Sequence, residues 1–171
     1  IQSADDEYKY GAVKRYEKTA HVERALEAMQ KHGLRVKCDH MFDLPGEPAN
    51  AQDTARRLYA KHPPYRIQTY WTNLLPGTEM VDQALENGLV SREQVDRLEE
   101  GFDFDFFRES NLGRDPTRMR VFKSYETLFK LLPVLPRRLR ERWTADTFSR
   151  LPALACTLLG FLVDAGYGLF S

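Results

Sequence analysis

Residues 34–47 read Leu-Arg-Val-Lys-Cys-Asp-His-Met-Phe-Asp-Leu-Pro-Gly-Glu and contain the clearest strand signal of the chain. From Leu34 to Phe42, two groups of residues alternate along the chain. Leu, Val, Cys, His and Phe stand at every second position, and Arg, Lys, Asp and Met stand between them. This period of two is typical of a β-strand. The strand is expected to stop at the turn Leu44-Pro45-Gly46-Glu47-Pro48, because proline and glycine punctuate secondary structure strongly.

Helical patterns lie on both sides of this strand. Before it, Thr19 is a suitable N-cap, apolar residues recur at helical spacing through residues 22–29, and Gly33 is placed to end the helix in the left-handed conformation. After it, Asn50 is expected to cap a second helix, which Pro63-Pro64 cannot continue.

A second strand is predicted over residues 65–74, which are rich in Ile, Thr, Tyr and Trp and end at Pro76-Gly77. A third helix is expected from about residue 78 to 87, and Ser91 with Gln94 forms a capping-box pair before a fourth. Strands separated by helices of this length are joined as parallel neighbours through crossovers. Residues 1–100 are therefore predicted to form an α/β domain.

Residues 101–171 differ in character and are predicted to form a mostly helical C-terminal extension. Residues 102–107 are an alternating aromatic run expected to plug a core, and a helix is expected over 117–132. This helix is expected to dock against the open edge of the sheet. Four arginines before Trp143 and the apolar tail after it leave open a peripheral membrane contact through 137–171, although the tail is too short to span a bilayer.

Charge and cysteine content exclude several classes of function. Lys plus Arg and Asp plus Glu both number 25, so bulk charge gives no attraction to nucleic acid or to an anionic membrane. The two cysteines, Cys38 and Cys156, have neither metal-ligand spacing nor a disulfide framework. A reducing, cytoplasmic location is expected. The first residue is Ile1, within a segment that looks like a strand end, so we expect a piece of a longer polypeptide.

Polar residues follow each of three expected strands, at residues 1–3, 42–47 and 73–78. In parallel α/β proteins the carboxyl ends of strands converge, and ligands bind there. Gln2 and Ser3 offer hydrogen-bonding groups, and Glu47 is a carboxylate beside a tight turn. These three ends are therefore the candidate site.

Four of these segments together resemble the second half of the radical S-adenosylmethionine (SAM) enzyme core, and within it the cobalamin-binding group that includes the anaerobic magnesium-protoporphyrin ester cyclases. Ile1-Gln2-Ser3 resembles the end of the fourth barrel strand, and Lys14-Arg15-Tyr16 with Thr19 resembles the segment after it. Residues 39–47 resemble the fifth-strand motif, with Asp43 where that motif has glycine, and residues 70–78 resemble the end of the sixth strand.

The resemblance implies a partial (β/α) barrel related to the TIM barrel, and a site for SAM beside a [4Fe-4S] cluster. It implies that Gln2 and Ser3 face the ribose hydroxyls and that Arg15 approaches the methionyl carboxylate. It further implies adenine contacts from Met41 and Phe42, with Leu74 beside them. Proteins of this family generate a 5'-deoxyadenosyl radical that abstracts hydrogen from an organic substrate.

The three cluster-binding cysteines of the family are missing from this chain. The cluster ligands, and a cobalamin domain if one is used, are thus expected in the N-terminal remainder of the same polypeptide, and the catalytic residues are not assigned. The substrate is expected to be a small organic or tetrapyrrole-like molecule, and nucleic acid is not an expected partner. Two alternatives stay open: a radical SAM protein without cobalamin, of the methylthiotransferase or coproporphyrinogen oxidase type, and a non-catalytic α/β interaction module.

Each assigned residue also has a plain structural explanation. Arg15 could be a solvated residue at a helix entry, and Gln2 and Ser3 could be frayed terminal residues. Met41 and Phe42 could be ordinary packing, and a histidine on an apolar face, such as His40, is more often a hydrogen-bonded core residue than a ligand.

Overall fold

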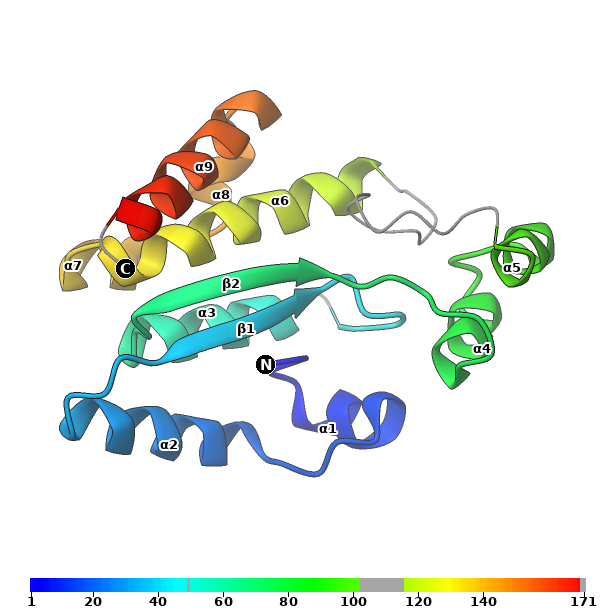
Figure 1. Ribbon diagram of the computed structural model, residues 1–171, viewed down its shortest axis with the longest axis horizontal. Helices are drawn as coiled ribbons and strands as arrows, with labels where there is room; N and C mark the ends of the chain where they lie inside the picture. The colour runs from blue at the N-terminus through cyan, green and yellow to red at the C-terminus, as the bar shows by residue number, and fades with distance from the viewer. Residues whose placement is uncertain (49, 102–115, 170–171) are drawn as a thin grey trace.

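The computed structural model describes residues 1–48, 50–101 and 116–169 of the chain. It is a mixed α/β structure, which confirms the predicted class, and its described part contains a two-stranded parallel sheet. Strand β1 spans Lys37–Phe42, strand β2 spans Arg66–Trp71, and helix α3 (Ala51–Lys61) connects them. Figure 1 shows α3 behind the two strands. The partial barrel stays a prediction.

The first residues of the chain extend this sheet on the β1 side. The backbone N–H of Met41 donates to the carbonyl oxygen of Ile1 at 3.1 Å. The backbone nitrogen of Ile1 donates to the carbonyl oxygen of Asp39. In a parallel pair, one residue bonds to the two residues that flank its partner on the other strand. Ile1 bonds to Asp39 and Met41, so it lies opposite His40. Three chain segments thus run side by side and point the same way, as the sequence predicts.

One face of the sheet is covered by α3 and by α6 (Pro116–Leu131), which lies along β2 in Figure 1. Alternate strand residues point to this face, and they join one hydrophobic core with side chains of both helices. Its buried members are Ala4, Phe42, Ala55, Tyr59, Ala60, Ile67, Phe122, Leu128, Phe129, Leu132, Phe148 and Cys156. The opposite face carries exposed or half-buried side chains.

Helix α2 (Thr19–Lys31) ends as predicted, with Gly33 in the left-handed conformation at φ 69°. Its beginning differs from the prediction, because Lys18 is the N-cap and makes no side-chain capping bond. Thr19 is instead the first helical residue, and its backbone N–H donates to the Asp6 carboxylate at 2.8 Å. A carboxylate distant in sequence therefore takes the place of a local cap.

Two short helices follow β2. They are α4 (Glu79–Glu86) and α5 (Arg92–Glu99), and the predicted capping box of Ser91 and Gln94 is present. They enclose a second, smaller core with Leu74. In Figure 1 both helices lie beyond the carboxyl ends of the strands.

The C-terminal part is helical, as predicted. After α6 come the 3₁₀ turn η2 (Leu132–Val134) and helices α7 (Arg137–Arg142), α8 (Asp146–Ser149) and α9 (Ala153–Leu169). The Thr69 hydroxyl of β2 donates to the Glu126 carboxylate of α6 at 3.2 Å, so this helix docks on the covered face of the sheet, whereas the sequence predicts docking against the open edge. The aromatic run at 102–107 lies outside the described residues. None of the described helices is both long and apolar enough to cross a membrane.

Candidate functional site

Three of the predicted site residues come together on the open face of the sheet. Because Ile1 lies opposite His40, the next residue, Gln2, lies beside Met41, which pairs with Tyr70 of β2. Arg15 reaches the same row, since its Nε donates to the Gln2 Oε1 at 3.1 Å. The Arg15 side chain is exposed and makes no ion pair within the described part of the chain. This row combines the Gln2 amide and the Arg15 guanidinium with the side chains of Met41 and Tyr70.

A tight reversal of the chain brings Arg15 to Gln2. Helix α1 (Asp6–Tyr8) continues into η1 (Lys9–Val13), a single turn of π-helix that ends at Lys14 in the left-handed conformation. The backbone N–H of Arg15 then donates to the carbonyl oxygen of Lys9 at 2.9 Å. Such π turns are rare and are frequent at functional sites. The sequence gives no periodic signal for this turn.

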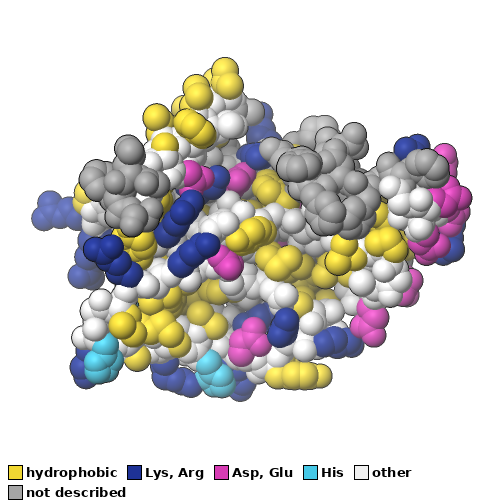
Figure 2. Space-filling view, in the orientation of Figure 1, with side chains coloured by type: hydrophobic (Ala, Val, Ile, Leu, Met, Phe, Trp, Pro, Cys, Tyr) yellow, Lys and Arg dark blue, Asp and Glu magenta, His cyan; other side chains and the backbone are white. Residues whose placement is uncertain are grey.

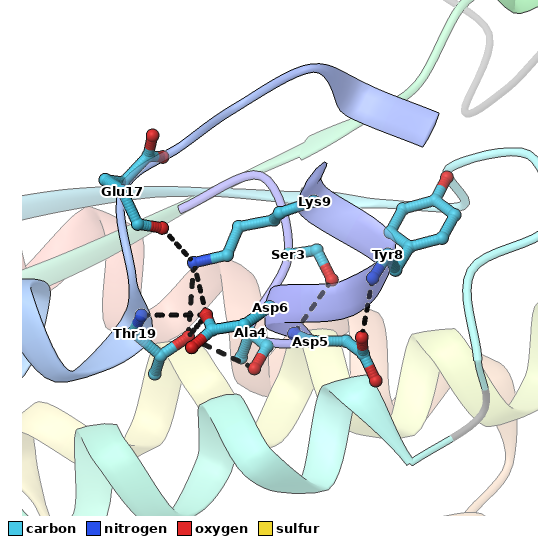
Figure 3. A network of polar contacts seen from close by, with 8 residues as sticks. All are labelled: Ser3, Ala4, Asp5, Asp6, Tyr8, Lys9, Glu17 and Thr19. Carbon is cyan, nitrogen blue, oxygen red and sulfur yellow. Dashed lines mark hydrogen bonds and ion pairs between the residues drawn. The ribbon is translucent and has the colours of Figure 1, made fainter. Parts of the chain in front are cut away.

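A buried lysine anchors the reversal, as Figure 3 shows. Lys9 is only 1% exposed. Its ammonium lies 2.9 Å from the Asp6 carboxylate and donates to the carbonyl oxygen of Glu17 at 2.9 Å and to the Thr19 hydroxyl at 3.2 Å. The same Asp6 oxygen accepts from the Thr19 hydroxyl at 2.7 Å. A charged group this deep is tolerated because every neighbour in this cluster is an acceptor or a counterion.

The side chains of Ser3, Phe42 and Leu74 lie apart from this row. Ser3 is fully buried, and its Oγ accepts from the backbone N–H of Asp5 at 3.2 Å. Phe42 is buried on the covered face, with its ring centre 5.6 Å from that of Phe129. Leu74 belongs to the second core with α4 and α5. The six predicted residues therefore divide into an open row, Gln2, Arg15 and Met41, and three buried side chains.

Asp43 occupies a left-handed backbone conformation, with φ 65°. The position therefore has the geometry that favours the glycine of the family motif, and aspartate is among the few other residues that adopt it readily. The carboxylate is buried and accepts from the Arg118 Nε at 2.7 Å. Arg118 also donates to the carbonyl oxygen of Leu44 at 3.3 Å. This arginine of α6 thus holds the turn after β1 from far along the chain.

A buried chain of hydrogen bonds runs behind the strand ends. His40 is fully buried, with Nδ1 at 3.1 Å from the Tyr59 hydroxyl and Nε2 at 2.9 Å from the Gln52 Oε1. The Gln52 amide donates to the Glu47 Oε2 at 2.9 Å. Because Gln52 donates through its nitrogen, its oxygen accepts from His40 Nε2–H, and Nδ1 accepts from Tyr59. His40 is thus a hydrogen-bonded core histidine, as the sequence favours.

The pKa values of His40 and Glu47, two titratable members of this hydrogen-bonded series, are shifted in directions that disfavour the charged form. Burial lowers the pKa of His40 to about 3, so the imidazole is neutral. Burial raises the pKa of Glu47 to about 7, although the Ser3 hydroxyl and the Gln52 amide partly offset this rise. The Glu47 Oε1 is buried and has no hydrogen-bond partner among the described residues. The donor to its Oε2 is the Gln52 side chain of α3.

No group of three or more His, Cys, Asp or Glu side chains that could hold a metal occurs in the described part of the chain. Cys38 lies on β1, and Cys156 is buried in α9, where its Sγ is 3.7 Å from the carbonyl oxygen of Phe148. Two thiols are too few for a cluster held by three cysteines.

Several residues of this region carry no signal, or only a weak one, in the sequence pattern. Arg118 and Lys9 have no local signal, because their roles depend on contacts between distant segments. Gln52 and Tyr59 are seven positions apart on one predicted helix, so helical periodicity places them on one face. That face could have been identified as the partner of His40.

Comparison with models of protein families, with curated proteins and with solved structures found no match to this chain.

Proposed function

We propose that this chain is the SAM-holding half of a radical SAM enzyme. The observation that carries the proposal is the open row at the tips of three parallel segments, where Arg15 is hydrogen-bonded to Gln2 beside Met41. In (β/α) barrels ligands bind at the carboxyl ends of the strands, and Met41 lies one residue before the end of β1. The positive φ of Asp43, at a position where the resembling motif has glycine, is a second supporting feature.

In this proposal each side chain of the row has a distinct role. The Arg15 guanidinium binds the methionyl carboxylate through charge-assisted hydrogen bonds, and the Gln2 amide binds a ribose hydroxyl. Met41 offers a polarizable surface to the adenine ring. Ser3, Phe42 and Leu74 support the strand tips from the buried side. Bound SAM, next to a [4Fe-4S] cluster held by the rest of the polypeptide, supplies the radical chemistry on an organic substrate.

Glu47 and its hydrogen-bonded chain position the turn that follows β1. The carboxylate connects this turn to α3 through Gln52, and Arg118 connects the same turn to α6. The Gln52 contact is buried and the Arg118 contacts are partly buried, so the strand tip is held rigidly where the ligand would lie. A cobalamin domain, or its absence in the second enzyme alternative, does not change these roles.

The test is an equilibrium titration of SAM into a protein extended upstream to include three closely spaced cysteines. Arg15→Gln is expected to weaken binding roughly tenfold, because it removes a charged hydrogen-bond donor. Arg24→Gln, an exposed arginine on α2, is the matched control and should bind as the parent does. Unchanged affinity for Arg15→Gln removes Arg15 from the site. If the upstream cysteines are absent, or if no SAM binds, the radical SAM proposal is wrong and the non-catalytic interaction module is the remaining alternative.

A second candidate function, contact with a membrane surface, is favoured by the outer face of α9. Large apolar side chains at helical spacing are exposed along it, and Figure 2 shows hydrophobic side chains gathered at the top of the molecule, where this helix lies. They are Leu154 (71% exposed), Leu158 (53%), Phe161 (67%) and Leu162 (65%). Exposed arginines on α7 (Arg137–Arg142) supply charge complementary to anionic lipid.

Flotation with vesicles that contain an anionic phospholipid tests this contact. The double change Leu158→Ser and Phe161→Ser is expected to abolish flotation, because it removes the two central apolar groups of the face. Val134→Ser, an exposed apolar residue outside α9, serves as the control. Failure of the parent protein to float rules the membrane contact out.

A further inference from the structure

A cleft of about 560 Å³ lies between α3 and α7 and is lined mostly by basic side chains. Its lining is Arg56, Arg57, Ala60, Lys61, His62, Arg137, Arg140 and Glu141. Four arginines and one lysine thus face a single carboxylate. The chain as a whole has equal numbers of acidic and basic residues, so this concentration of positive charge is local.

Most of these cations already have acidic partners at the rim. Asp53 accepts from Arg56 at 2.7 Å and from Arg57 at 2.6 Å. Lys61 lies 2.6 Å from Glu23, and Arg137 lies 2.8 Å from Glu141. These pairs leave the positive charge in the cleft only partly neutralised.

Arg140 is different from the other cations in this cleft. It has no ion pair within the described residues, and its Nε is buried without a hydrogen-bond acceptor there. A buried donor without an acceptor costs free energy, and such groups in folded proteins usually mark a missing partner. Arg140 lines the cleft, so an anion bound there would be the counterion that this arginine lacks among the described residues.

The cleft lies away from the open row of Gln2, Arg15 and Met41. Helix α3 begins after the turn that follows β1 and ends at Lys61, just before β2 begins at Arg66. The cleft is therefore at the amino ends of the strands, whereas the row is at their carboxyl ends. SAM carries a net positive charge, so this cleft would repel it.

We propose that the cleft between α3 and α7 binds an anion that carries phosphate, with the Arg140 guanidinium as its central donor. Arginine is the preferred residue for phosphate because its planar group forms two parallel hydrogen bonds with the oxygens. The volume falls in the range of small-molecule sites, so a phosphate ester larger than a single phosphate fits. This proposal does not depend on the proposed SAM site.

Calorimetric titration of the 171-residue chain with inorganic pyrophosphate tests the proposal. Arg140→Gln is expected to weaken binding roughly tenfold, through loss of a charged donor. Arg142→Gln removes the same charge from the same helix but outside the cleft, and should change affinity little. Equal weakening by both changes would overturn the proposal, because it would show general charge attraction.

Glu141→Gln provides a test that a folding defect cannot imitate. It removes the one carboxylate of the lining and frees Arg137, so pyrophosphate is expected to bind about threefold more tightly. Vesicles with an anionic phospholipid, compared in the same variants, distinguish a lipid headgroup from a free phosphate compound. If neither pyrophosphate nor vesicles bind in a manner dependent on Arg140, the proposal fails.

Discussion

At the scale of single residues, His40 and Glu47 are both buried and both hydrogen-bonded to Gln52. They make the stability of the fold depend on pH in opposite directions. His40 has a lowered pKa of about 3 in the folded chain, so acid favours the unfolded state, which takes up the proton near the usual value of 6.5. Glu47 has a raised pKa of about 7, so the folded state holds a proton that the unfolded state releases above the usual value of 4.5. The Glu47 carboxyl therefore lowers stability as pH rises through this interval.

Glu47→Gln is expected to isolate this effect. The amide imitates the protonated carboxyl, so the variant should match the parent near pH 4 and exceed it by roughly 3 kcal/mol in free energy of unfolding at about pH 8. Urea denaturation over this pH range is the measurement. Because His40 is present in both proteins, its contribution cancels. A constant difference between the two proteins at every pH would contradict the raised pKa.

Asp43 is a second residue whose conformation can be tested separately from its charge. Asp43→Gly and Asp43→Ala both remove the carboxylate that Arg118 binds, but only glycine accepts φ 65° without strain. Asp43→Ala is expected to be the less stable of the two by about 1 kcal/mol, measured by urea denaturation. Equal stability of the two variants would show that the backbone here relaxes to negative φ.

At the scale of elements, Asp6 both neutralises Lys9 and accepts from the first backbone N–H of α2. Asp6→Ala is expected to cost roughly 3 kcal/mol, because it leaves a buried ammonium without its counterion. The control is Asp96→Ala, which breaks an exposed pair with Arg92 within α5 and should cost less than about 1 kcal/mol. Thermal or urea unfolding of both variants checks this. Similar losses would show that the Lys9 cluster contributes no more than a surface pair.

At the scale of the whole molecule, the two predicted segments, 1–100 and 101–171, share one core. Phe42, Tyr59 and Ile67 from the first segment pack with Phe122 and Phe129 from the second. The His40 ring also meets the Phe129 ring edge to face, with the ring centres 4.7 Å apart. The covered face of the sheet therefore needs α6 to exclude water.

A chain cut after residue 101 is thus expected not to fold cooperatively, because it exposes the apolar groups that α6 covers. In the full chain, Phe129→Ala should cost about 3 to 5 kcal/mol, whereas Leu158→Ala, on the exposed face of α9, should change stability little. Circular dichroism and urea denaturation are the measurements. A cooperative transition of the shortened chain would show that residues 1–101 form an independent domain.

The elements of this chain could be predicted largely from local pattern. Alternation identified β1, although the strand begins at Lys37 and not at Leu34, since side chains alone do not tell where backbone pairing starts. The capping box at Ser91 and the left-handed Gly33 were also predictable, because both depend on a few neighbouring residues. Local pattern predicts Thr19 as a cap, but Thr19 is the first helical residue, because the carboxylate that accepts its N–H is on another segment.

The candidate site also has some features that follow from local sequence and others that depend on tertiary contacts. Parallel strands and the order of their tips follow from periodicity, turn residues and the handedness of crossovers, which are properties of short stretches of sequence. Only tertiary contacts decided that Gln2, Arg15 and Met41 share the open face, that Arg118 binds Asp43, and that Lys9 is buried. These facts join residues far apart in the chain, and their energies arise from burial and ion pairing, which exist only once the segments have packed together.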